Sequence, residues 1–258
     1  MTLLDGRVVL VSGGTQGVGA AVARAAAREG AAVAVTGRRP EPGNALVEEL
    51  RGAGARAQYV RCDVADVSDA QAAVQTVLAE FGRVDCLVNA AGLTARGTLL
   101  DTTPELFDQH IAINLRGPFF LMQAVVGHLV ARKAPGTVVN IISSSELGGQ
   151  PYLAPYVAAK AGLAGLTRNA AHAHRWDRVR INGLDIGWTD TEGEDTTQRE
   201  FHDADDGWRE RAGKALPMGK LGQADEIADF VVFLLSDRSG VVTGSVIDWD
   251  QNIFGGLD

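Results

Sequence analysis

Short hydrophobic runs alternate with longer amphipathic stretches along the whole chain. The short runs are rich in valine, isoleucine and leucine and are bounded by glycine or polar residues, which favours strands buried on both faces of a sheet. These predicted strands cover residues 7–12, 32–36, 57–62, 84–88, 136–142 and 178–184, and a last strand lies within 242–249. The apolar spacing between them predicts helices over 20–28, 44–51, 68–81, 104–131, 156–174 and 225–235, with a turn at 40–43.

Strands that alternate with helices in this way predict an α/β fold, a Rossmann-type doubly wound parallel sheet with helices on both faces. We expect one domain over residues 1–258, because this length is routine for a single α/β domain. Ligands of such sheets bind beyond the carboxyl ends of the strands. Residues 192–215 break the periodic pattern, and we expect a substrate loop with short helices over about 187–215.

A glycine-rich turn follows the first predicted strand and leads directly into a helix. Glycines let a backbone approach a pyrophosphate closely, and a helix start offers free N–H groups and a positive dipole end. The order of strand, turn and helix therefore predicts a dinucleotide site. The expected contacts from this turn are Gly13, Thr15, Gln16, Gly17, Val18 and Gly19.

The end of the second predicted strand indicates which dinucleotide is preferred. An acidic residue there would bind the ribose 2′-hydroxyl of NAD, but this chain has Arg38 and Arg39. Because a guanidinium suits a phosphate, NADP is favoured over NAD. The alternative is that these arginines are solvated charges in a turn, which leaves NAD open.

Polar and small residues follow two further strands at the same predicted edge. Asp63, followed by Val64, either accepts the adenine amino group or caps its own loop. The small residues after the fourth strand would let a nicotinamide lie against the backbone; this segment contains Asn89, Ala90, Ala91 and Gly92.

Tyr156 and Lys160 stand four residues apart in a predicted helix, which places them on one face, a single turn apart. A neighbouring cation favours the phenolate, so we expect the lysine to lower the pKa of the tyrosine. Ser143, Ser144 and Ser145 follow the fifth strand, and one of these hydroxyls would hold a substrate oxygen. A surface tyrosine beside a solvated lysine is the plain alternative, but the other polar strand ends converge on the same edge.

Composition excludes several classes of function. A net charge of −8 argues against nucleic acid or an anionic membrane as partner. No window reaches the length of a membrane span, and the start of the chain lacks a signal-peptide pattern, so we expect a cytoplasmic protein. Cys62 and Cys86 lack metal-site spacing and are expected as buried thiols. The five histidines are scattered, and no metal site is predicted.

Taken together, these motifs resemble the classical short-chain dehydrogenase/reductase (SDR) family over nearly the whole chain. They are Gly13-x-x-x-Gly17-x-Gly19, Asn89-Ala-Ala-Gly92, Asn114, the serine after strand five, and Tyr156-x-x-x-Lys160. The resemblance implies that tyrosine is the acid/base, that lysine lowers its pKa and binds the nicotinamide ribose, and that asparagine supports a proton relay. It selects Ser143 to hold the substrate oxygen, with Ser144 and Ser145 as alternatives. It also implies a homotetramer or homodimer.

The chain departs from the family pattern at two places. The family has Pro-Gly and then a threonine after strand six, whereas this chain has Ile186, Gly187 and Thr191, which we still expect to contact the cofactor. The family often closes with Asp-Gly-Gly, and Asp250-Gln-Asn252 replaces it, which predicts altered C-terminal contacts.

The expected function is NAD(P)-dependent hydride transfer between nicotinamide and the carbon of a carbonyl or secondary alcohol. The acidic residues of 192–215 are typical of a solvated face, but any that line the pocket disfavour polyanionic substrates. A sugar, polyol or other small hydroxy compound is therefore favoured. A 3-oxoacyl thioester reductase is one alternative, and a non-catalytic dinucleotide-binding sensor or scaffold is another. Trp188, Phe201 and Trp208 form either a lid or ordinary core.

Overall fold

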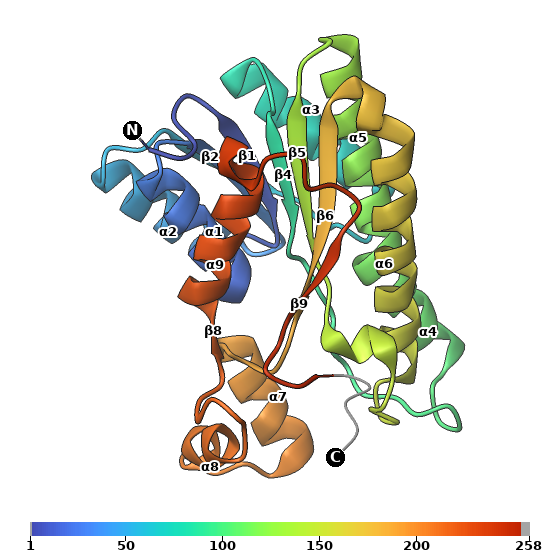
Figure 1. Ribbon diagram of the computed structural model, residues 1–258. Coiled ribbons are helices and arrows are strands. Elements are labelled where there is room, and N and C mark those ends of the chain that lie inside the picture. The colour runs from blue at the N-terminus through green and yellow to red at the C-terminus, as the bar shows by residue number, and fades with distance from the viewer. Residues whose placement is uncertain (1, 254–258) are drawn as a thin grey trace.

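A seven-stranded parallel sheet forms the centre of the computed structural model, which describes residues 2–253 (Figure 1). Its strands are β1 (Val8–Ser12), β2 (Ala32–Gly37), β3 (Ala57–Arg61), β4 (Cys86–Asn89), β5 (Gly136–Ile141), β6 (Val179–Ile186) and β9 (Val246–Trp249). Their spatial order is β3-β2-β1-β4-β5-β6-β9, and every neighbouring pair runs parallel. Because the order reverses at β1 and β4, a crevice is expected beyond their carboxyl ends.

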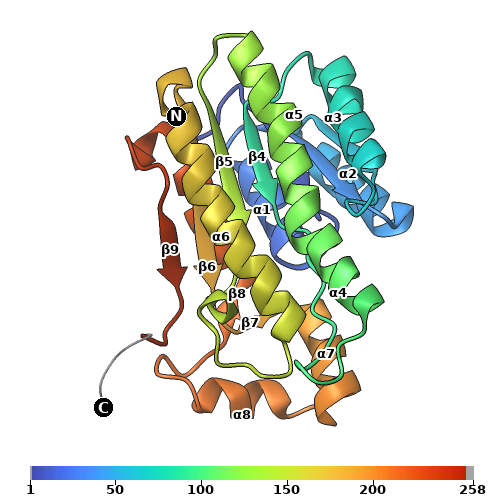
Figure 2. The same cartoon turned by 90° about the vertical axis from the view of Figure 1, so that its right-hand side faces the viewer.

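Helices cover both faces of this sheet (Figure 2). One layer consists of α1 (Gly17–Arg28), α2 (Pro40–Gly52) and α9 (Ala224–Leu235). The opposite layer contains α3 (Val67–Phe81), α5 (Gly117–Ala131) and α6 (Ala154–His174), with α4 (Pro104–Ile111) leading into α5. The predicted doubly wound α/β fold in a single domain is confirmed.

Two hydrophobic cores arise from the alternation of side chains along the central strands. In β1, Val9 and Val11 face the α1 and α9 layer, whereas Val8 and Leu10 face the α3 and α5 layer. All four residues are buried, which explains why the strand reads as a continuous apolar run.

Two predicted helix starts are wrong. Residues 40–43 were expected to form a turn, but α2 begins at Pro40, whose missing N–H is tolerated at the first helical position. Helix α3 begins before Ser68, because the Asp66 carboxylate caps it by accepting hydrogen bonds from the Ser68 and Asp69 N–H groups.

Helices α4 and α5 join through a π-helical segment, Ala112–Arg116, which contains Asn114. A wider turn of this kind interrupts the ordinary hydrogen-bond pattern and is frequent at functional sites. The helix type therefore changes at Asn114, but the helix does not end there.

The irregular segment packs beyond the carboxyl edge of the sheet, where Figure 1 shows α7 and α8. It comprises β7 (Thr189–Asp190), α7 (Glu192–His202), α8 (Trp208–Lys214) and β8 (Gly222–Gln223). Short 3₁₀ turns lie at Ser144–Leu147, Arg175–Asp177 and Asp237–Ser239. Trp208 is buried in a small core with Ala212 and Leu221, whereas Trp188 and Phe201 remain partly exposed, so the aromatic residues divide between core and surface.

Candidate active site

A cleft of about 1260 Å³ opens at the carboxyl edge of the sheet. It is lined by residues at or directly after the carboxyl ends of β1, β2, β4, β5 and β6, and α7 lines one side. The predicted site residues that line it are Gly13, Thr15, Gln16, Gly17, Val18, Gly19, Arg38, Arg39, Asp63, Val64, Ala90, Ala91, Gly92, Ser143, Tyr156, Lys160, Ile186, Gly187 and Thr191. This volume is ample for a dinucleotide with a small substrate.

The glycine-rich turn packs so closely that side chains would not fit. A Cβ on Gly13, which has a φ of +70°, would lie 2.5 Å from the Ala91 Cα atom. A Cβ on Gly19 would lie 2.2 Å from the Gly13 oxygen. The turn therefore brings the amino end of α1, at Gly17, directly onto the cleft, and this suits the phosphates of a dinucleotide.

Two arginines lie at the far end of the cleft, directly after β2. The Arg39 guanidinium donates a hydrogen bond to the Gln16 side chain across the mouth of the glycine turn. Arg38 is exposed, and within residues 2–253 its side chain has no hydrogen bond or ion pair. Its donors are therefore free for a phosphate.

Asp63 shows which of its two expected roles the fold supports. Its carboxylate accepts a hydrogen bond from the Ala65 N–H over 3.1 Å, so it caps its own loop. The side chain also lines the cleft, so both roles remain compatible with its position.

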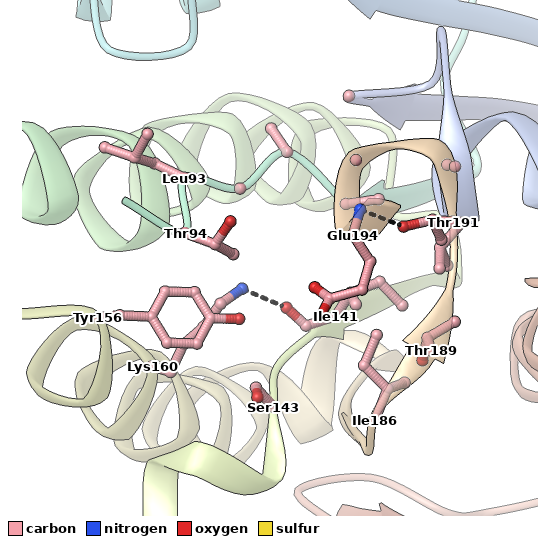
Figure 3. Close-up of a pocket in the computed structure, with 18 of the residues that line it drawn as sticks. Leu93, Thr94, Ile141, Ser143, Tyr156, Lys160, Ile186, Thr189, Thr191 and Glu194 are labelled. Atoms are coloured by element: carbon pink, nitrogen blue, oxygen red, sulfur yellow. Dashed lines mark hydrogen bonds between the residues drawn. The ribbon is translucent and has the colours of Figure 1, made fainter. Parts of the chain in front are cut away.

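Tyr156 and Lys160 lie in the first turns of α6, and Ser143 follows β5 opposite them (Figure 3). The Lys160 Nζ atom is 5.6 Å from the centre of the Tyr156 ring. Of the three serines, Ser145 is buried and donates its hydroxyl to the Gln150 Oε1 atom, whereas Ser143 donates to the Ser145 Oγ atom over 3.1 Å, lines the cleft and lies near enough to the phenol to affect the pKa of Tyr156. The geometry therefore favours Ser143 as the group that holds a substrate oxygen.

The ionisation of this pair differs from the sequence expectation. Burial raises the pKa of Tyr156 to about 12, and the nearby Ser143 side chain opposes this rise. Burial lowers the pKa of Lys160 to about 8, and the Asp185 carboxylate opposes this fall. The expected lowering of the tyrosine pKa is absent in the free protein because desolvation of the phenolate outweighs the neighbouring cation.

Asn89 and Asn114 lie behind the cleft wall rather than on it. The Asn89 Nδ2 atom donates to the Asn140 side chain over 2.8 Å, and Asn140 donates to the Thr167 hydroxyl of α6 over 2.8 Å. Asn114 accepts from the Leu93 N–H over 2.9 Å and donates to the Leu93 oxygen over 3.0 Å. Both side chains therefore brace the elements that carry the site.

His110 is a buried member of the site that the sequence analysis missed. Its ring meets the Tyr156 ring edge to face, with centroids 6.1 Å apart. Asn114 donates to its Nδ1 atom, so Nε2 carries the proton and donates to the Ala95 oxygen over 3.1 Å. The spacing of four between His110 and Asn114 was a usable signal, because it places both on one helix face.

Two charged residues on the substrate side were also missed. Glu194 accepts a hydrogen bond from the Trp188 indole over 2.7 Å, and Figure 3 shows its carboxylate facing the Tyr156 phenol across the pocket. Arg96 lines the same cleft and lies over the rings of Tyr152 and Phe201.

The rest of the acidic segment matches the expected solvated face. Its carboxylates are held by neighbouring arginines, as where Asp195 pairs with Arg199 and Arg209 over 2.9 Å. An exposed pair of this kind is worth little to stability but orders the segment.

The two departures from the family pattern have structural counterparts. Without proline, Gly187 is held by a hydrogen bond from its N–H to the Trp249 oxygen over 3.2 Å. Gln251 accepts from the Met218 N–H over 2.8 Å and donates to the Lys220 oxygen over 2.7 Å. Gln251 therefore ties the C-terminal segment to the loop after α8.

Comparison with known proteins agrees with this geometry. The sequence profile described as enoyl-(acyl carrier protein) reductase matches residues 13–251. The chain is 37% identical over 253 residues to D-threitol dehydrogenase of Mycolicibacterium smegmatis, covering 97% of this chain and 94% of that one. It is 32% identical over 250 residues to the 3-oxoacyl-[acyl-carrier-protein] reductase of Thermotoga maritima, covering 97% and 98%. The crystal structure of a point variant of actinorhodin polyketide ketoreductase with NADPH superposes with a TM-score of 0.91 at 30% identity, covering 97% and 98%.

The chain belongs to the short-chain dehydrogenase/reductase family. Together with the site, this membership makes it an NAD(P)-dependent oxidoreductase that acts on CH–OH or carbonyl groups. In the part of the chain that the structure describes, no helix is long and apolar enough to cross a membrane, and no cluster of side chains could hold a metal ion. Cys62 and Cys86 are buried free thiols, as predicted.

Proposed function

We propose that this enzyme prefers NADP and interconverts a small neutral hydroxy compound, a polyol or sugar, with its carbonyl form. The observation that carries the proposal is the arrangement of one cleft. Ser143, Tyr156 and Lys160 line this cleft together. The free guanidinium of Arg38, directly after β2, lines the same cleft.

The residues of the chain would perform the proton chemistry. In reduction, Tyr156 gives its phenolic proton to the substrate oxygen while Ser143 holds that oxygen; in oxidation the proton returns to the phenolate. Lys160 stabilises the phenolate and binds the cofactor ribose. NADP, when bound over the glycine turn, supplies or accepts the hydride at its nicotinamide ring.

The charge of the pocket supports a neutral substrate. Glu194 faces the tyrosine and would accept hydrogen bonds from substrate hydroxyls, which a polyol provides in number. The similarity to D-threitol dehydrogenase supports the same class. A 3-oxoacyl thioester on an acidic carrier is the alternative, and the net charge of −8 disfavours such a partner.

We further propose that residues 187–215 form the substrate segment and that the enzyme works as a homotetramer or homodimer in the cytoplasm. Helix α5 supports assembly, because it is apolar on all sides and leaves Phe119 and Val130 partly exposed. Two free thiols fit a reducing compartment.

Fluorescence titration with NADPH and NADH, followed by turnover assays on polyols, sugars and ketones, tests the proposal. We expect tighter binding of NADPH and turnover with at least one polyol or sugar. Equal binding of the two cofactors would overturn the stated preference. Turnover confined to 3-oxoacyl thioesters would overturn the substrate class.

A further inference from the structure

Asp185, near the carboxyl end of β6, is a buried carboxylate without a partner. It is 1% exposed, and neither oxygen has a hydrogen-bond partner among the described residues. It does not line the cleft, so a bound substrate or cofactor does not account for it. A buried carboxylate without compensation is costly, so this residue calls for a functional explanation.

The register of the sheet places Asp185 beneath the catalytic helix. Ile141 pairs with Leu184, so Asp185 is the neighbour of Ile142 on the next strand. A Cβ on Gly183 would touch the Ile142 side chain, and Ile142 packs against α6. Since side chains two apart share a face, Asp185 also points toward α6.

The titratable groups that face this carboxylate come from three elements. Lys160 and Tyr156 lie on α6, Glu146 on the turn after β5, and Asp248 on β9. Lys160 is the one cation in this set. The carboxyl group therefore has two states, neutral with its own proton or anionic opposite the Lys160 ammonium.

We propose that Asp185 is a positioning residue whose carboxylate, buried beneath α6, raises the proton affinity of the Tyr156 phenol. This inference rests on the proposed roles of Tyr156 and Lys160. As an anion, Asp185 holds the lysine charged but opposes the phenolate. As a neutral acid, it leaves the full field of the ammonium acting on the phenol. These two effects of the anion oppose each other, and direct repulsion of the phenolate is the larger, because Asp185 is among the main charges that raise the pKa of Tyr156. The carboxylate therefore acts against deprotonation of the tyrosine.

Burial supports this arrangement, because it raises the pKa of Asp185 to about 7 from its ordinary value of 3.8. The carboxylates of Glu146 and Asp248 add to the rise, and the nearby Ser143 backbone N–H and Lys160 oppose it. Both protonation states are therefore populated near neutral pH, where the tyrosine is needed.

The test compares the pH dependence of alcohol oxidation in the parent enzyme and in Asp185→Asn. Without the negative charge, the phenolate forms at lower pH, and we expect the acid limb of the kcat/KM profile to move down by about half to one pH unit. Asp5→Asn is the matched control, because Asp5 is exposed before the amino end of β1 and does not line the cleft. We expect its profile to match that of the parent.

A second readout keeps the inference separate from the proposed function. The chain has three tyrosines, so tyrosinate absorbance can be titrated, with Tyr156→Phe identifying the signal of Tyr156. We expect that signal to shift to lower pH in Asp185→Asn, or in Asp185→Ser if the asparagine variant does not fold. An inactive parent would refute the proposed function and leave this titration to decide the inference. Superimposable Tyr156 titrations in parent and variant would overturn the role of Asp185.

Discussion

The Lys160 Nζ atom donates a hydrogen bond to the Ile141 backbone oxygen over 2.8 Å, which ties α6 to the carboxyl end of β5. This bond uses one of three ammonium donors and satisfies a strand-end carbonyl that would otherwise be buried without a partner. The lysine is therefore held in place before any ligand arrives, with two donors left for a ribose and a proton relay.

Replacing Arg38 and Arg39 by alanine is expected to weaken NADPH binding about ten- to a hundredfold while NADH binding changes little. The reason is that one or two charge-assisted hydrogen bonds to a 2′-phosphate would be lost. Fluorescence titration with both cofactors measures the effect. Arg28→Ala is the control, because Arg28 pairs with Asp229 away from the cleft. Equal losses of affinity for NADPH and NADH would show that the two arginines do not bind the 2′-phosphate.

Gly19→Ala is expected to reduce affinity for either dinucleotide by about tenfold or more, because the added Cβ would lie 2.2 Å from the Gly13 oxygen and must push the turn open. Calorimetric titration gives the affinity. Gly165→Ala on α6 is the matched control, since nothing lies within 4 Å of its added Cβ. It should bind cofactor normally and gain up to about 1 kcal/mol in stability. Unchanged dinucleotide affinity in Gly19→Ala would contradict the inference that close packing of the glycine-rich turn shapes the binding site.

Asn114→Ala should lower the free energy of unfolding by about 1 to 3 kcal/mol, because it leaves the Leu93 backbone groups and the His110 Nδ1 atom unpaired. Urea denaturation measures the loss. The exposed Asn44→Ala on α2 should change stability by less than about 0.5 kcal/mol. Equal effects of the two substitutions would argue against a bracing role for Asn114.

The buried carboxyl of Asp185 predicts a pH-dependent stability. Its pKa is raised from 3.8 to about 7 on folding, so the folded state binds more protons than the unfolded state between these values. Stability is then fully present below about pH 4 and falls as the pH rises toward 7, by up to about 4 kcal/mol. Relative to the parent, Asp185→Asn should gain stability across that window in denaturation experiments. If the difference in unfolding free energy between Asp185→Asn and the parent stays constant from about pH 4 to 8, the raised pKa of Asp185 is contradicted.

Local patterns predict most of the fold and much of the cleft. Valine-rich runs such as residues 7–12 predict strands because a parallel sheet buries both faces of its strands. Since parallel strands end at the same edge of the sheet, polar residues that follow them lie along that edge. The start of α2 was missed because proline signals a turn as readily as a first helical position.

The remaining site residues depend on contacts that no local pattern encodes. Asp185 sits in an otherwise apolar strand, and only the register with β5 and the packing of α6 show that it lies beneath Lys160. Glu194 stands in an acidic run typical of a solvated face, yet the α7 fold turns it toward the tyrosine. The raised pKa of Tyr156 likewise follows from burial, which spacing along a helix does not reveal.

Tyr156→Phe is the most direct test of hydride transfer assisted by this phenol. The variant keeps the ring, so its NADPH affinity in fluorescence titration should equal that of the parent, while its turnover of the best alcohol or ketone substrate should fall by about a hundredfold or more. Turnover at the parent rate, with cofactor still bound, would contradict the assignment of Tyr156 as the proton donor and acceptor.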